Sequence, residues 1–100
     1  MNTLSLTFAA NHPVGAGHFP GNPIVPGALL LAEVVHCIAR AEAADFSACN
    51  IKAAKFPAPA RPGDTVDIEY SRTAQGSLEF RCAVNGNQVL SGVLSATIGA

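Results

Sequence analysis

The chain has 100 residues, of which 49% are hydrophobic and only 13% are charged, with a formal net charge of −1 at pH 7. A chain of this length forms one domain, so we expect residues 1–100 to fold as a single unit. The apolar content excludes intrinsic disorder, and the near-neutral charge excludes the basic surface of a nucleic-acid or anionic-membrane binder. Ordinary domains carry about 25% charged residues, so we expect a second copy of the chain to cover part of the surface.

The N-terminal residues and the cysteines favour a cytoplasmic protein. No apolar run approaches the roughly 20 residues of a membrane-spanning helix, and Met1-Asn2-Thr3 lacks the basic start of a secretory signal. The cysteines form no Cys-x-x-Cys pair, and no His/Cys/Asp cluster has the spacing of metal ligands. We therefore expect no membrane span, no metal site and no disulfide framework, with Cys37, Cys49 and Cys82 as reduced, buried side chains.

The first quarter of the chain predicts a short strand followed by a long loop. Leu4 to Ala10 is the predicted strand. Asn11 to Gly27 contains four prolines and four glycines, which exclude regular structure. A loop of this length is usually functional or disordered. Its apolar residues Phe19, Ile24 and Val25 favour packing against the domain.

Ala28 to Ala44 is the single long helical segment, because Ala, Leu, Glu and Arg dominate it and neither Gly nor Pro interrupts it. At 100° per residue, the large apolar side chains form one broad face and the alanines a second stripe. Glu33, His36 and Arg40 form a narrow polar stripe. This pattern predicts a mostly buried helix.

The remaining sequence has the alternation typical of strands, with Val66, Ile68 and Tyr70 on one face of one of them. The predicted strands are Cys49–Phe56, Asp64–Ala74, Ser77–Val84 and Gln88–Ile98. Turn residues at Arg61–Asp64, Gln75-Gly76 and Asn85-Gly86 place neighbouring strands antiparallel. The prediction is an α+β fold in which an N-terminal strand and a four-stranded meander wrap around one long helix.

The segment that enters the helix has the residues best suited to chemistry. A helix N-terminus offers unpaired N–H groups and a partial positive charge, and Gly27 and Ala28 leave room for a ligand oxygen to approach. His18 lies nine residues before Gly27 on a proline-stiffened loop. An imidazole beside a polarised carbonyl is the minimum needed to remove a proton α to a thioester or ketone. The structural alternative is a rigid loop in which His18 only hydrogen-bonds the backbone.

The run HFPGNPIVPG at residues 18–27, followed by an apolar helix, resembles the signature of the β-hydroxyacyl-(acyl-carrier-protein) dehydratases. Lys55-Phe56 and the run from Ala60 to Asp64 resemble the stretch that follows the helix in that family. The resemblance covers about residues 11–98. It implies the hot-dog fold, an antiparallel sheet wrapped around one long central helix, and dehydration of 3-hydroxyacyl thioesters in fatty-acid-type biosynthesis. It also implies a homodimer or higher homo-oligomer with active sites shared between subunits.

The resemblance assigns roles residue by residue. His18 matches the catalytic base, while the backbone N–H groups of Gly27 and Ala28 match those that hold the thioester carbonyl. Phe19 and Pro26 match residues that shape the binding loop. The substrate would be carried on the phosphopantetheine of acyl carrier protein or on CoA, and no metal or other cofactor is implied.

One position departs from the family pattern. The family places a catalytic Asp or Glu fourteen residues after the histidine, where this chain has Ala32. Three interpretations stay open: Glu33 reaches the site through a shifted helix start, His36 supplies the acid from one turn further on, or dehydration has been lost. The rival functions are an acyl thioesterase and a catalytically degenerate subunit that binds an acyl group or a partner. The structural alternatives are a polar-stripe residue bonded to Arg40 or to a neighbouring subunit for Glu33, and a satisfied, half-buried histidine for His36.

Four basic residues are candidates for contact with an acidic carrier protein or with a phosphopantetheine phosphate: Lys52, Lys55, Arg61 and Arg72. Exposed basic residues more often serve only solvation, so the sequence alone does not choose among them.

Overall fold

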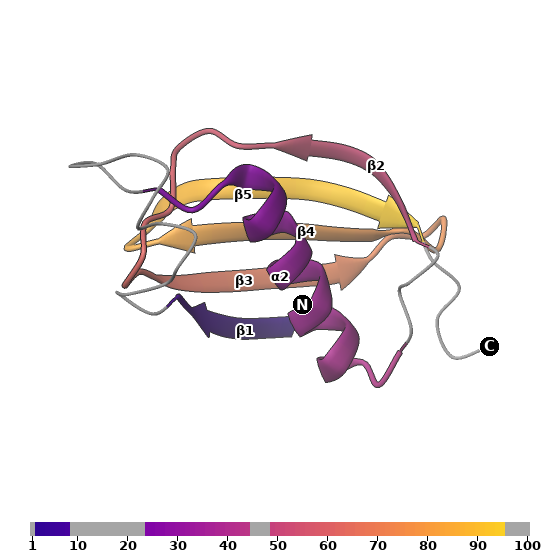
Figure 1. Ribbon diagram of the computed structural model, residues 1–100. Helices are drawn as coiled ribbons and strands as arrows, with labels where there is room; N and C mark the ends of the chain where they lie inside the picture. The colour runs from indigo at the N-terminus through magenta and orange to yellow at the C-terminus, as the bar shows by residue number, and fades with distance from the viewer. Residues whose placement is uncertain (1, 9–23, 45–48, 96–100) are drawn as a thin grey trace.

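The computed structural model describes residues 2–8, 24–44 and 49–95 (Figure 1). These residues form β1 (Asn2–Thr7), α2 (Gly27–Ala41), β2 (Asn50–Lys55), β3 (Thr65–Arg72), β4 (Leu78–Val84) and β5 (Asn87–Ser95). The strands form one antiparallel sheet in the order β1-β3-β4-β5-β2, and α2 crosses one face of it. The predicted α+β arrangement of a sheet around one helix is confirmed.

β3 and β4 agree with the predicted alternation, and the turn between β4 and β5 lies where it was predicted. Val66, Ile68 and Tyr70 of β3 are buried, while the residues between them are exposed. Asn85 and Gly86 both have positive φ, 52° and 83°, which is the conformation of a type I′ hairpin between β4 and β5.

The strand order corrects the predicted four-stranded meander. Only β3, β4 and β5 are consecutive neighbours, because β2 pairs with β5 at the far edge, Asn50 opposite Ser95 and Lys55 opposite Ser91. The β2–β3 connection, residues 56–64, carries three prolines, which lack the N–H that a ladder needs. It is also too long for a tight hairpin, so it crosses the end of the sheet (Figure 1).

The first strand lies earlier than predicted. It pairs with β3 from Asn2 opposite Tyr70 to Thr7 opposite Thr65. β3 begins at Thr65, so no ladder partner remains beyond Thr7, and the next residue, Phe8, instead bonds the turn through Asp64 and Gly63. The predicted continuation to Ala10, and the end of the last strand at Ile98, lie outside the described residues.

The helix ends three residues before the predicted Ala44. The N–H groups of Ala43 and Ala44 donate to the carbonyls of Arg40 and Ala39, at 3.2 and 2.9 Å. Ala43 adopts φ 52°, so this is the Schellman arrangement that usually employs glycine. Because alanine occupies that position, the sequence contained no stop signal.

Tight packing joins α2 to the sheet. Leu30, Val34 and Ile38 are only 2%, 0% and 0% exposed, and they face the apolar side chains of β3, β4 and β5. Phe80 of β4 lies opposite Gly92 of β5 in the sheet. A Cβ on Gly92 would lie 2.5 Å from Phe80 Cζ and 2.8 Å from the Ala53 carbonyl oxygen, so no larger residue fits there.

A side-chain hydrogen bond holds the C-terminal end of the helix. The Tyr70 hydroxyl donates to Glu42 Oε2 at 3.0 Å, which joins the cap of α2 to β3. Burial, followed by the hydrogen bond and the charge of Glu42, raises the pKa of Tyr70 above its ordinary value.

The buried face of α2 is narrower than predicted. The sheet covers one side only, so within one chain Ala28, Ala32, His36 and Arg40 are exposed. These four residues recur every fourth position and therefore share the face opposite Leu30, Val34 and Ile38. A mostly buried helix is wrong for the single chain.

Candidate active site

The N-terminus of α2 is uncapped. Pro26 occupies the N-cap position with extended backbone, no side chain caps the helix, and no acidic residue lies in the first turn. The first helical bond runs from the Leu30 N–H to the Pro26 carbonyl at 3.0 Å. Within the described ranges, the N–H groups of Gly27 and Ala28 have no acceptor. These donors lie at the positive end of the helix dipole, which suits an oxygen that gains negative charge.

An aromatic ring from β2's end packs against this first turn. A Cβ on Gly27 would lie 3.1 Å from Phe56 Cε1, so the ring rests directly on the glycine. Phe56 itself is 46% exposed. The predicted roles of Pro26, Gly27 and Ala28 thus fall on a helix start that is open to a ligand on one side and bounded by a ring on another.

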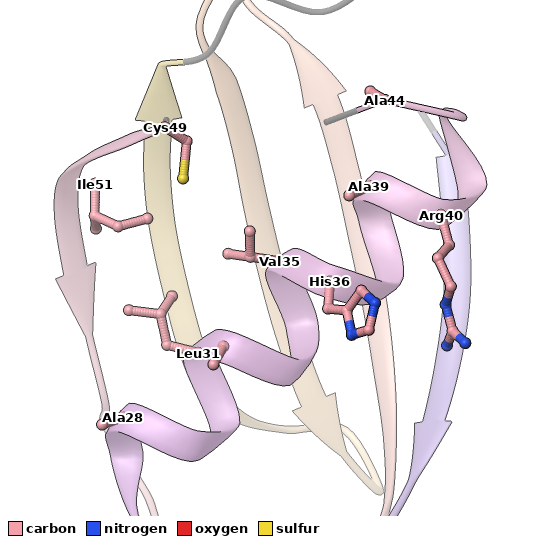
Figure 2. A pocket seen from close by; sticks show the side chains of 10 residues that line it. Ala28, Leu31, Val35, His36, Ala39, Arg40, Ala44, Cys49 and Ile51 are labelled. Atoms are coloured by element: carbon pink, nitrogen blue, oxygen red, sulfur yellow. The ribbon is translucent and has the colours of Figure 1, made fainter. Parts of the chain in front are cut away.

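A groove of about 680 Å³ runs along α2 from this end, between the exposed helix face and β2 (Figure 2). We call it the helix groove. Ala28, Ala32, His36 and Arg40 line it from the exposed stripe of α2. Leu31 and Val35 of α2 line its β2 side together with Ile51 and Cys49. It is therefore largely apolar, with its cationic and imidazole groups towards the C-terminal half of the helix.

The candidate acids fall on different parts of the helix. Ala32, fourteen residues after His18, lines the helix groove. His36, one helical turn further along, also lines it (Figure 2). Glu33 is half-buried and is not part of the lining. It forms no ion pair with Arg40 or another described residue. Ala32 and His36 therefore both line the helix groove, whereas Glu33 does not.

His18 and Phe19, the predicted base and loop residue, lie outside the described residues. Among the described residues, no group of three His, Cys, Asp or Glu side chains could hold a metal ion.

The cysteines occupy different environments. Burial raises the pKa of the Cys82 thiol from 9.0 to about 12, with a smaller effect from Cys37, so Cys82 stays a neutral core side chain. Cys37 and Cys49 are half-buried, and Cys49 lines the helix groove. The expected burial is confirmed fully for Cys82 and in part for the other two.

The sequence patterns missed the contribution of β2. Phe56, Ile51 and Cys49 border the helix start and the groove only because β2 lies at the edge next to β5. A signal was present in the sequence: Ile51 and Phe56 are the large apolar residues of a segment otherwise made of Asn, Lys and Ala, and the structure leaves them 39% and 46% exposed. Such exposed side chains mark surfaces that another molecule covers.

Comparison with known proteins identifies the family to which the chain belongs. Residues 1–93 match the sequence profile of the ApeI-like family, described as ApeI dehydratase. The 3-hydroxyacyl-[acyl-carrier-protein] dehydratase FabZ of Wolbachia sp. subsp. Drosophila simulans is 31% identical, over 88% of this chain and 69% of that protein. The enzyme of the same name from Chlamydia trachomatis serovar L2 is 39% identical, over 81% of this chain and 61% of its own length.

Solved structures show the same fold. The dehydratase heterocomplex ApeI:P from Xenorhabdus doucetiae contains a chain with TM-score 0.73 and 25% identity, covering 93% of this chain and 83% of that one. The predicted hot-dog fold is confirmed. The chain spans between 57% and 69% of the length of the first curated relatives it matches. Among the described residues, no helix has the length and hydrophobicity that crossing a bilayer requires.

Proposed function

The chain belongs to the ApeI-like dehydratase family, and from this premise we propose that it removes water from a 3-hydroxyacyl thioester carried on acyl carrier protein or CoA. The dehydratase relatives support this reaction. The observation that carries the proposal is the helix groove, which begins at the uncapped end of α2 and continues past Ala32 to His36. One pocket thus offers an oxyanion site and a proton donor to the same acyl group.

The reaction divides into a proton removal and a C–O cleavage. His18, which the motif places just before the helix, takes the proton from C2 of the substrate. The thioester oxygen gains negative charge, which the N–H groups of Gly27 and Ala28 stabilise. The electron pair then forms the C2–C3 double bond while the C3–O bond breaks. The hydroxyl leaves as water once it receives a proton.

We assign that proton to His36, acting as an imidazolium or through a water molecule. It lines the same groove as Ala32, the position that holds a carboxylate in the family. One helical turn is about 5.4 Å, a gap that the His36 side chain or a bridging water spans. Glu33 is a poorer candidate because a step of one residue turns the side chain by about 100°. His36 therefore replaces the carboxylate in this proposal.

A second hot-dog subunit completes the site in this proposal. The exposed stripe of α2 and the apolar wall at Ile51 favour a covering partner, as does the low charged fraction of the chain. We propose a homodimer, with a different hot-dog chain as the alternative because the ApeI:P neighbour is a heterocomplex. Light scattering of the purified chain distinguishes them, since a persistent monomer excludes the homodimer. A cytoplasmic location stays a prediction from the sequence.

Incubation with a 3-hydroxyacyl carrier thioester tests the activity. Formation of the 2-enoyl thioester, followed by its ultraviolet absorbance, is the expected result, and His18→Ala should abolish it. Release of a free thiol would instead indicate a thioesterase. Acyl binding without either product would indicate a degenerate binding subunit. Either of these outcomes contradicts the proposed dehydration.

A further inference from the structure

A second hollow lies at the end of the sheet where α2 begins. It measures about 630 Å³ and lies between the β2–β3 connection and the β4–β5 hairpin. Figure 1 shows both segments and the helix start at the same end of the molecule. We call it the hairpin-end pocket. Its polar lining comes from two charged residues of the connection and three amides of the hairpin: Arg61, Asp64, Asn85, Asn87 and Gln88.

The hairpin-end pocket adjoins the start of α2 through one short piece of chain. Phe56 packs on Gly27, and the next residue, Pro57, lines the pocket. The Val25 N–H donates to the Ala60 carbonyl at 2.7 Å, which fixes the connection against the segment before the helix. Arg61 follows Ala60 directly, so its backbone lies within roughly 15 Å of the first turn of α2. A single extended ligand can therefore contact both places.

Arg61 is the one basic side chain in the described lining of this pocket, and no described carboxylate pairs with its guanidinium. Asp64 Oδ2 instead accepts a hydrogen bond from the Arg61 backbone N–H at 2.7 Å and closes the turn. The carboxylate repels an anion, so an anionic group must meet the outer end of the guanidinium, away from the turn. Guanidinium groups bind phosphate in this way with paired hydrogen bonds.

We propose that the hairpin-end pocket binds the phosphopantetheine arm of the thioester substrate, with Arg61 on its phosphate. This inference rests on the proposed function, because that function places the thioester carbonyl at the start of α2. The arm is an extended chain with two amide groups and a dimethyl branch. The amide side chains of Asn85, Asn87 and Gln88 match the former, and the apolar surface of Pro57, Pro59 and Val84 matches the latter.

The test compares thioesters that carry different lengths of the arm. A 3-hydroxyacyl phosphopantetheine thioester has the whole arm, and the N-acetylcysteamine thioester lacks the dimethyl branch and the phosphate. We expect Arg61→Gln to lower kcat/KM about tenfold or more for the first and to leave the second unchanged. Arg72→Gln is the matched control, since this exposed arginine ends β3 at the opposite end of the strand. Asn87→Ala should show a smaller loss with the same substrate preference.

Two results overturn the assignment: an equal loss on both thioesters, or no loss on either. Thioesters of CoA and of carrier protein distinguish the sources of the arm. Equal losses with both support a site for the shared phosphopantetheine, whereas a loss confined to the carrier protein shows that Arg61 contacts the carrier itself and overturns the assignment.

Binding of phosphopantetheine alone, measured by calorimetry, separates this inference from the reaction. Binding that Arg61→Gln weakens supports the pocket even if no thioester is dehydrated. Absence of binding, together with an unchanged kcat/KM in Arg61→Gln, rejects the pocket while dehydration stands. Thermal unfolding of each variant shows whether a loss reflects folding.

Discussion

The two faces of α2 differ in what they serve. One face carries Leu30, Val34 and Ile38, all but fully buried against the sheet. The opposite face carries Ala28, Ala32, His36 and Arg40, which contact no core and line the helix groove. The buried face stabilises the fold of the single chain. The face that lines the groove is suited to contact another molecule. Substitutions on the first face should therefore change the free energy of unfolding, and those on the second should change activity.

Placing the same carboxylate on each face should give the largest contrast. Val34→Asp buries an unpaired charge in the core, which costs several kcal/mol and consumes most of the stability of a small domain. Ala32→Asp should cost only about 0.5 kcal/mol, mainly through helix propensity. Urea unfolding followed by circular dichroism measures both. Equal stabilities would mean that Ala32 packs tightly against another chain instead of lining an open groove.

On the exposed face, His36→Gln should lower kcat about 100-fold, because a general acid typically contributes 10²–10⁴-fold. Glu33→Gln, on the neighbouring part of the helix, is the control and should change kcat little. The double variant Ala32→Glu/His36→Gln should recover activity, since a carboxylate then lines the groove. Loss of kcat in Glu33→Gln but not in His36→Gln would transfer the acid role to Glu33.

Below the buried face, the thiol of Cys82 makes stability depend on alkaline pH. Its pKa is raised by burial to about 12, so the folded chain holds a proton that the unfolded chain releases above about pH 8.5. The contribution of this thiol to stability should be constant below that pH and then fall by about 1.4 kcal/mol per pH unit as pH rises towards 12. Tyr70, whose pKa is also raised, adds to the fall above about pH 10.

Urea midpoints measured between pH 8 and 11 check this expectation. Cys82→Val is the control, because it retains an apolar side chain without a titrating group and should flatten the first part of the curve. A wild-type midpoint that stays constant to pH 11 would show that the thiol is accessible in the folded state.

We expect the smallest change in stability from substitutions at the C-terminal cap of α2, where both of its faces end. Ala43→Gly should stabilise the chain by about 1 kcal/mol, because glycine adopts the positive φ of this cap without the Cβ clash. Ala41→Gly, two residues earlier in ordinary helix, should instead destabilise by roughly 0.5–1 kcal/mol. Thermal unfolding of the pair resolves the opposite signs. A loss of stability in Ala43→Gly would mean that the cap is held by packing rather than by backbone preference.

Local patterns accounted for much of the fold. The alternation of Val66, Ile68 and Tyr70 predicted β3, and Asn85-Gly86 predicted the hairpin turn between β4 and β5, because each signal lies within a few residues. The position of β2 was predicted wrongly, since its partner is β5 and nothing near Asn50 specifies a strand that begins at Asn87. The helix end was missed because Ala43 takes a conformation that alanine rarely adopts.

The candidate site divides in the same way. The family spacing counted from His18 falls on Ala32, and helical periodicity places His36 one turn further on the same side, where both residues line the helix groove. The contact of Phe56 with Gly27 and the position of Ile51 in the groove wall depend on the path of β2. No local spacing in the sequence could therefore predict them. The motif alone assigned His18 and Phe19, and their roles stay predictions.

The strand order affects how this chain folds while it is being synthesised. Each edge strand pairs with a strand far along the sequence: Asn2 lies opposite Tyr70, and Asn50 lies opposite Ser95. β2 can therefore pair only after nearly all of the described residues have been synthesised. α2 leaves the ribosome long before the sheet that it packs against is complete. Such non-local topologies fold in milliseconds to seconds rather than microseconds. In that interval a nascent chain with 49% hydrophobic residues is a natural client for chaperones.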